Sequence, residues 1–299
     1  MKQETNNMIG LQNSVFLKNT RRSRVYYDEN GDKYFYKGIY YQREGVPDRI
    51  DYELLSELYL SRLARDYFNF KTPIYEVGRY KCIDKSVCVG VTSKDLEVEF
   101  DKCIDLFDFT GLLIPTLKDL NSNETYMSLS EDAKFQMVKA LLFQVVTMQY
   151  DMSGVNVLFG LKDQDVKDLI LLDFGSNGLS RLGKKLKTDD IDEKINNGGR
   201  FCLGLDSKLS NFKQMFFELQ YSNLISNEQL DRYLSEYGDI NKQVDCIKRI
   251  GEEIKSKNCV CSTSYQDLLS YSINKLTNML IDVYNDRLQN RRDKNEFVL

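Results

Sequence analysis

The sequence predicts an α+β protein with two lobes, a small β-rich N-terminal lobe with one helix and a larger, mainly helical C-terminal lobe. Short runs rich in Val, Tyr and Phe, separated by turn residues, occupy most of the first part of the chain. From about Ser93 onward the apolar residues recur at the helical period instead. Hydrophobic residues make up 42% of the 299 residues, which is enough for a sizeable packed core.

The N-terminal lobe is predicted to span residues 1–92 and to begin with a β-hairpin. Asn30-Gly31 lies between two β-rich runs and is a strong signal for a tight turn. A helix over residues 51–64 follows, with leucines spaced so that they bury one face. The expected strands of this lobe are residues 24–28, 33–37, 74–77 and 86–91.

The C-terminal lobe is predicted to span residues 93–299. Ser130 is a good N-cap for a helix that runs to about Met148, with apolar residues along one side. The other expected elements are strands at 156–159 and 169–172 and helices at 207–221, 227–237, 240–257 and 264–290.

The bulk composition removes several classes of function. The net charge of −4 disfavours nucleic acid as a partner, because binding its phosphates requires a clustered basic surface. No apolar run reaches the roughly eighteen residues of a membrane span and no signal-peptide pattern is present, so we expect no membrane insertion. A cytoplasmic protein is expected, with export as an effector left open. The chain contains no His, which excludes Ser-His-Asp hydrolases and His-ligated metal enzymes.

Two short motifs carry the candidate chemistry. Asp151 and Asn156 are five residues apart, in a loop between an expected helix and an expected strand. Asp173 follows Asn156 by 17 residues and opens the triplet Asp173-Phe174-Gly175, a gap that a β-hairpin fits. This order and spacing resemble the catalytic loop and the DFG triplet of the protein-kinase superfamily. The resemblance implies a two-lobed protein-kinase-like fold, with Asp151 accepting the proton of the attacking hydroxyl and with Asn156 and Asp173 holding Mg²⁺.

The resemblance extends from about residue 24 to residue 180 and is to HipA-like and CtkA-like bacterial Ser/Thr kinases. It implies that Lys37, at the end of a hairpin strand, positions the phosphates of ATP. Lys33 is the competing lysine. Glu57 is the implied partner that orients Lys37, and residues 89–96 are the implied hinge, with Val91 among the residues that bind the nucleotide.

The sequence departs from the kinase pattern at several positions. Gln149 stands where the eukaryotic pattern has His, Tyr150 replaces the Arg, and Ser153 replaces the His of the HipA-type loop. No Gly-rich phosphate loop is present, since the turn at residues 18–23 has no Gly. Residues 176–187 carry several cations where an activation segment is expected.

The leading hypothesis is an ATP- and Mg²⁺-dependent phosphotransferase, a Ser/Thr protein kinase with a protein substrate. Nothing in the motifs distinguishes a protein hydroxyl from another hydroxyl, so a lipid or small-molecule kinase is the alternative enzyme. A pseudokinase, which keeps the fold and acts as a binding module, is the alternative from another class. The missing Gly-rich loop favours it, whereas the presence of Lys37, Asp151, Asn156 and Asp173 favours the enzyme.

Overall fold

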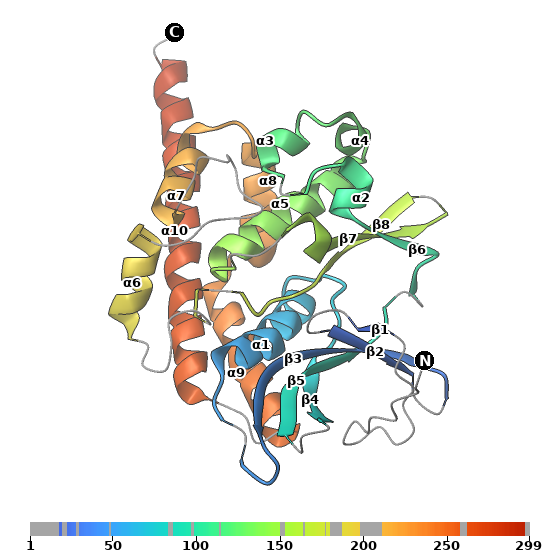
Figure 1. The fold of residues 1–299 in the computed structure, drawn as a ribbon. Coiled ribbons are helices and arrows are strands. Elements are labelled where there is room, and N and C mark those ends of the chain that lie inside the picture. Colours follow the sequence, from blue (N-terminus) through green and yellow to red (C-terminus); the bar gives the residue numbers. More distant parts are fainter. Residues whose placement is uncertain are drawn as a thin grey trace.

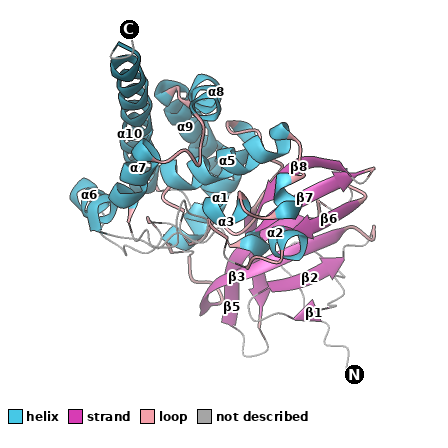
Figure 2. Cartoon of the chain, turned by 90° about the horizontal axis from the view of Figure 1, so that it is seen from above, coloured by secondary structure: helices cyan, strands magenta, loops and turns pink. Residues whose placement is uncertain are grey.

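The computed structural model has the predicted α+β architecture, with a small β-rich part and a larger helical part (Figure 1). Seen from above, the strands gather on one side of the molecule and most helices on the other (Figure 2). The structure describes residues 18–19, 23–27, 30–47, 49–82, 86–96, 99–113, 115–149, 153–163, 165–176, 178–179, 187–197, 211–257 and 262–296.

A five-stranded antiparallel sheet forms the β-rich part, in the order β1-β2-β3-β5-β4. The hairpin predicted at Asn30-Gly31 is present: β2 pairs with β3, and Gly31 has a φ of +83° that suits glycine. The strands are β1 (Lys18–Asn19), β2 (Ser23–Tyr27), β3 (Lys33–Arg43), β4 (Glu76–Lys81) and β5 (Ser86–Lys94). The lobe boundary predicted after residue 92 falls within β5, which continues for two more residues.

Helix α1 (Tyr52–Asp66) crosses this sheet and begins at Asp51, whose carboxylate accepts the backbone N–H groups of Glu53 and Leu54. The leucine spacing predicted one buried face. Instead, every residue from Leu54 to Ala64 is buried. A helix buried on all sides must be covered by a second layer, and α9 (Ile240–Lys257) supplies part of that layer (Figure 1).

The helical part contains a second sheet, in the order β6-β7-β8. Its strands are β6 (Lys102–Asp105), β7 (Val157–Lys162) and β8 (Asp165–Leu171), and β6 was not among the expected strands. Helix α5 (Glu131–Val146) precedes the loop that carries the first motif and is capped by Ser130, as predicted. After Ser153 the chain forms a 3₁₀ turn (Gly154–Asn156) that leads directly into β7.

Several helices complete the fold, and α8 and α9 have the bounds that the sequence predicted. The predicted helix at 207–221 begins outside the described residues. The helices not yet named are α2 (Leu106–Thr110), α3 (Leu117–Leu120), α4 (Glu124–Met127), α6 (Thr188–Asn197), α7 (Phe212–Tyr221), α8 (Asn227–Tyr237) and α10 (Thr263–Glu296). Within the described ranges, none of these helices is long and apolar enough to cross a membrane.

One hydrophobic core connects the two parts. Phe68, just after α1, packs its ring edge-on against Phe143 of α5, with the ring centroids 5.0 Å apart. The same ring stacks on Tyr237 of α8 at 5.4 Å. Aromatic packing of this kind fixes the small sheet and α1 relative to α5, and the candidate site lies along this junction.

Candidate active site

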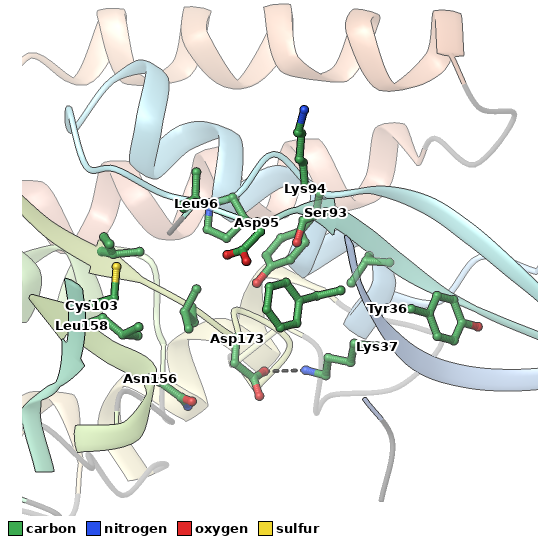
Figure 3. Close-up of a pocket in the computed structure, with 16 residues that line it drawn as sticks. Tyr36, Lys37, Ser93, Lys94, Asp95, Leu96, Cys103, Asn156, Leu158 and Asp173 are labelled. Carbon is green, nitrogen blue, oxygen red and sulfur yellow. Dashed lines mark hydrogen bonds and ion pairs between the residues drawn. The ribbon is translucent and has the colours of Figure 1, made fainter. Parts of the chain in front are cut away.

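A cavity of about 270 Å³ lies between the two sheets and is mostly apolar (Figure 3). Val91 of β5 lines one wall, and Leu158 of β7 and Ile170 of β8 line the opposite one. Three polar side chains, Lys37, Asn156 and Asp173, face the cavity at one end. An apolar slot with convergent polar groups at one end suits a ligand with a flat base and a charged tail.

Lys37 projects from the middle of β3 and contacts two carboxylates at once. Its Nζ lies 2.6 Å from Oε1 of Glu57 and 2.5 Å from Oδ1 of Asp173. Burial by itself lowers the pKa of Lys37, but the two carboxylates outweigh burial and raise the pKa above its ordinary value. Lys37 is therefore a permanent cation at the polar end of the cavity.

Glu57 lies on α1 and is fully buried. Its Oε2 accepts the backbone N–H of Phe174 at 2.9 Å, while its Oε1 binds Lys37. Burial raises the pKa of the Glu57 carboxyl, and the adjacent Lys37 ammonium opposes the rise. The ionised form fits this geometry, because the carboxylate receives one hydrogen bond on each oxygen and faces a cation.

Asp173 has the left-handed backbone conformation, with a φ of +57°, which is uncommon for a residue with a side chain. Its backbone carbonyl accepts a hydrogen bond of 2.9 Å from Nε2 of the buried Gln149. The next residue, Phe174, is buried against Phe143 and Tyr75, with ring centroids at 6.1 and 6.4 Å. These contacts hold the strained residue so that its carboxylate points at the cavity.

Gly175 leaves room for the ion pair. A Cβ at this position would lie 2.9 Å from Oε1 of Glu57 and 3.2 Å from Nζ of Lys37. Any larger residue would push against the charged pair, so the third residue of the triplet is constrained by packing.

Asn156 and Asp173 form an oxygen-rich corner that fits a magnesium ion. Both side chains line the same end of the cavity, and the Asp173 carboxylate is 36% exposed, so it can reach a ligand (Figure 3). The strand that ends before Asp173 is tied to the loop, because the N–H of Leu172 donates to the Asn156 carbonyl at 2.9 Å. Mg²⁺ is usually held by one or two protein oxygens together with substrate phosphates, which is the donor set available here.

Val91 is 1% exposed and pairs with Lys37 on one side and with Val77 on the other. Because both of its backbone edges face a neighbouring strand, Val91 can contact a ligand only through its side chain. The ladder between β4 and β5 begins at the pair Glu76–Thr92, so the edge of β5 from Ser93 onward lies beyond β4 and lines the cavity. Lys33, the competing lysine, instead binds Asp95 at 2.8 Å at the far end of this edge.

Some of the predicted site lies outside the described residues. These residues include Asp151, the predicted proton acceptor, together with Tyr150. The middle of the turn at 18–23 and residues 180–186 of the cationic run also lie outside them. The structure thus brings together Lys37, Glu57 and Asp173, with Asn156 and Val91 on the same cavity.

Sequence reasoning missed two residues that support the triplet. Gln149 was recognised only as a departure from the pattern, and its bond to a backbone carbonyl leaves no trace in the sequence. Tyr75 was assigned to a strand, yet its ring packs on Phe174 and its hydroxyl hydrogen-bonds with the Asp173 backbone. Burial and the nearby Glu57 carboxylate raise the pKa of Tyr75 well above its ordinary value, so the hydroxyl stays neutral.

Comparison with known proteins supports the fold. No family model matches the chain, and no curated protein matches it. Among solved structures, the Helicobacter pylori proinflammatory kinase CtkA is similar over 95% of this chain and 96% of its own, with a TM-score of 0.59 and 13% identity. The chain therefore has a protein-kinase-like fold, of the kind found in CtkA, as the sequence predicted.

Two further structures are more distant. HipA of Shewanella oneidensis MR-1, solved with HipB and operator DNA, has a TM-score of 0.45 and 11% identity over 90% of this chain and 67% of its own. APH(2")-IIia, solved with GDP and kanamycin, has a TM-score of 0.26 and 15% identity over 84% of this chain and 95% of its own. Both scores are too low to add to the assignment of the fold.

The hydrogen bond from Gln149 to the triplet leads to a first prediction. Gln149→Met keeps length and removes the donor, so Asp173 loses a support worth about 1 kcal/mol. For the kinase activity proposed below, we expect phosphate transfer to fall about fivefold and the Mg²⁺ concentration for half-maximal activity to rise. Gln149→His, which restores an N–H donor, should recover most of the loss.

Gln144 provides a matched control for this prediction. It is also fully buried, and neither amide atom has a partner among the described residues. Gln144→Met should therefore leave transfer and Mg²⁺ dependence unchanged. Equal losses in the two Met variants would contradict a role for the bond to Asp173.

Proposed function

We propose that the protein is an ATP- and Mg²⁺-dependent kinase that phosphorylates Ser or Thr hydroxyls of a protein substrate. The observation that carries the proposal is the arrangement of Lys37, Glu57 and Asp173 beside a cavity that also includes Asn156. A buried glutamate that orients a lysine toward a metal-binding aspartate is the arrangement that phosphoryl transfer in protein kinases requires.

Each residue has a separate task in this proposal. Lys37 binds the α- and β-phosphates, and Glu57 keeps its ammonium at the polar end of the cavity. Asp173 and Asn156 hold Mg²⁺, which neutralises charge on the phosphates when bound. Apolar side chains such as Val91 and Leu158 enclose the adenine ring of ATP.

Asp151 is proposed to act on the acceptor. The acceptor hydroxyl oxygen attacks the γ-phosphorus while the bond from that phosphorus to the bridging oxygen of ADP breaks. The hydroxyl proton passes to the Asp151 carboxylate. The choice of Ser or Thr in a protein follows the sequence resemblance, and the fold similarity to the kinase CtkA is consistent with it.

The test is transfer from γ-labelled ATP with Mg²⁺ to the protein itself or to offered proteins, followed by mapping of the phosphorylated residue. Lys37→Ala removes the cation that positions the phosphates and leaves Glu57 buried without its partner. We expect nucleotide affinity or turnover to fall at least tenfold, or about 1.4 kcal/mol.

Lys81→Ala is the matched control. Lys81 lies in the same sheet and is also ion-paired, at 2.7 Å with Glu44, but it does not line the cavity. It should behave as wild type. A large loss in Lys33→Ala together with wild-type behaviour of Lys37→Ala would reverse the choice of lysine. A protein that binds ATP but phosphorylates nothing would be a pseudokinase.

A further inference from the structure

The outer face of α1, the side away from the sheet, is covered by residues from the last part of the chain. Tyr265, at the start of α10, is fully buried there. Its hydroxyl lies 2.9 Å from Oγ of Ser56, which immediately precedes Glu57. Its ring stacks on Tyr52 at 5.7 Å and contacts Tyr59 at 5.3 Å. Tyr265 thus contacts α1 five residues before Glu57, at the residue next to it, and two residues after it.

Helix α9 approaches the same face very closely. Gly251 lies in the middle of α9, where glycine costs about 1 kcal/mol relative to alanine. A Cβ at this position would lie 2.9 Å from the Tyr59 hydroxyl and 2.3 Å from Oε1 of Gln266 on α10. A larger residue here would force the ends of these two side chains to move, so glycine lets α9, α10 and α1 pack closely.

The end of α1 is also fastened to the C-terminal helices. Asp66 forms an ion pair of 3.1 Å with Arg249 of α9. The hydroxyl of Tyr67 donates to the carbonyls of Tyr237 and Asp239, each at 3.1 Å, just before α9. Both ends of α1 and its outer face are therefore held, so a rotation that withdraws Glu57 from Lys37 would have to break all of these contacts.

From these contacts we infer that Tyr265 is a positioning residue that acts through Glu57. The layer formed by α9 and the start of α10 packs against α1 and keeps Glu57 in the orientation for catalysis. A separate activating partner is then not needed to orient α1. The inference rests on the proposed kinase function, in which Lys37 must be oriented by Glu57. It also assigns a role to α9 and the start of α10, which carry no motif.

The test is a double-mutant cycle between Tyr265 and Glu57. Tyr265→Phe removes the hydroxyl near Ser56, and Tyr265→Leu also removes the stacked ring. We expect kcat to fall about threefold in the first variant and about tenfold in the second, with a smaller change in the KM for ATP. In a Glu57→Gln background the same changes should alter kcat less than about twofold, because the residue through which Tyr265 acts is already lost.

Tyr284→Phe is the control on the same helix. It removes a hydroxyl that lies 2.6 Å from Asp231, far from α1, and should leave kcat unchanged. Urea unfolding of each variant measures its free energy of unfolding, so a loss of kcat without a loss of stability indicates positioning. If Tyr265→Leu does not fold, the comparison is made with Tyr265→Phe alone. Equal fold-losses of kcat in both backgrounds would overturn the inference while the kinase function stands. A wild-type protein that transfers no phosphate would instead overturn the proposed function, and this inference with it.

Discussion

Replacing Asp173 by Asn should strongly reduce phosphate transfer and weaken Mg²⁺-dependent binding of ATP at the same time. Asn keeps the size of the side chain and tolerates the left-handed conformation, so the fold at φ +57° should persist. The negative charge that would attract Mg²⁺ in the proposed site is lost, however. We expect transfer to fall on the order of a thousandfold and ATP affinity in Mg²⁺ about tenfold. Calorimetric titration with and without Mg²⁺, together with single-turnover transfer, measures both.

Asp163 offers a close control for this substitution. It also has a positive φ, +53°, and it is exposed in the turn between β7 and β8, away from the cavity. Asp163→Asn should leave both binding and transfer intact. If Asp173→Asn bound ATP equally well with and without Mg²⁺ and still transferred phosphate, Asp173 would not be the metal ligand.

Asp151→Asn should separate chemistry from binding. The change removes the proposed base for the hydroxyl proton but keeps Lys37, Asn156 and Asp173. ATP affinity should remain within a few-fold of wild type, whereas transfer should fall on the order of a hundredfold or more. The combination of retained binding and lost transfer distinguishes this variant from Asp173→Asn. Parallel losses of binding and transfer would place Asp151 among the nucleotide ligands instead.

The sequence predicts the elements that have either a sustained hydrophobic repeat or specific turn residues. The bounds of α8 and α9 match because each has a sustained amphipathic repeat, and the hairpin at Asn30-Gly31 matches because its turn residues are specific. Strand β6 was missed, since its four residues show no alternation and it is defined by pairing with β7. The complete burial of α1 was also missed, because the residues that cover its outer face come from far along the chain.

In the candidate site, too, the sequence did not predict the contacts made by residues from distant parts of the chain. Lys37, Glu57 and Asp173 were named from spacing and resemblance, and the structure places them in contact; their roles remain proposals. The support from Gln149 and the burial of Phe174 depend on backbone geometry and on packing across the junction of the two parts. Sequence motifs identify the groups that do chemistry, whereas the residues that hold them in place are distributed through the fold.

The contact between Ser56 and Tyr265 joins residues 209 positions apart, and this separation has a consequence for biosynthesis. Strand β3 and helix α1, with Lys37 and Glu57, leave the ribosome long before α9 and α10 are made. Until those helices dock, the apolar outer face of α1 is bare, a situation that invites association with chaperones or aggregation. The nascent chain thus carries every motif before it has an enclosed site. Competence for the proposed catalysis should therefore appear only after α9 and α10 have been made and have packed over α1.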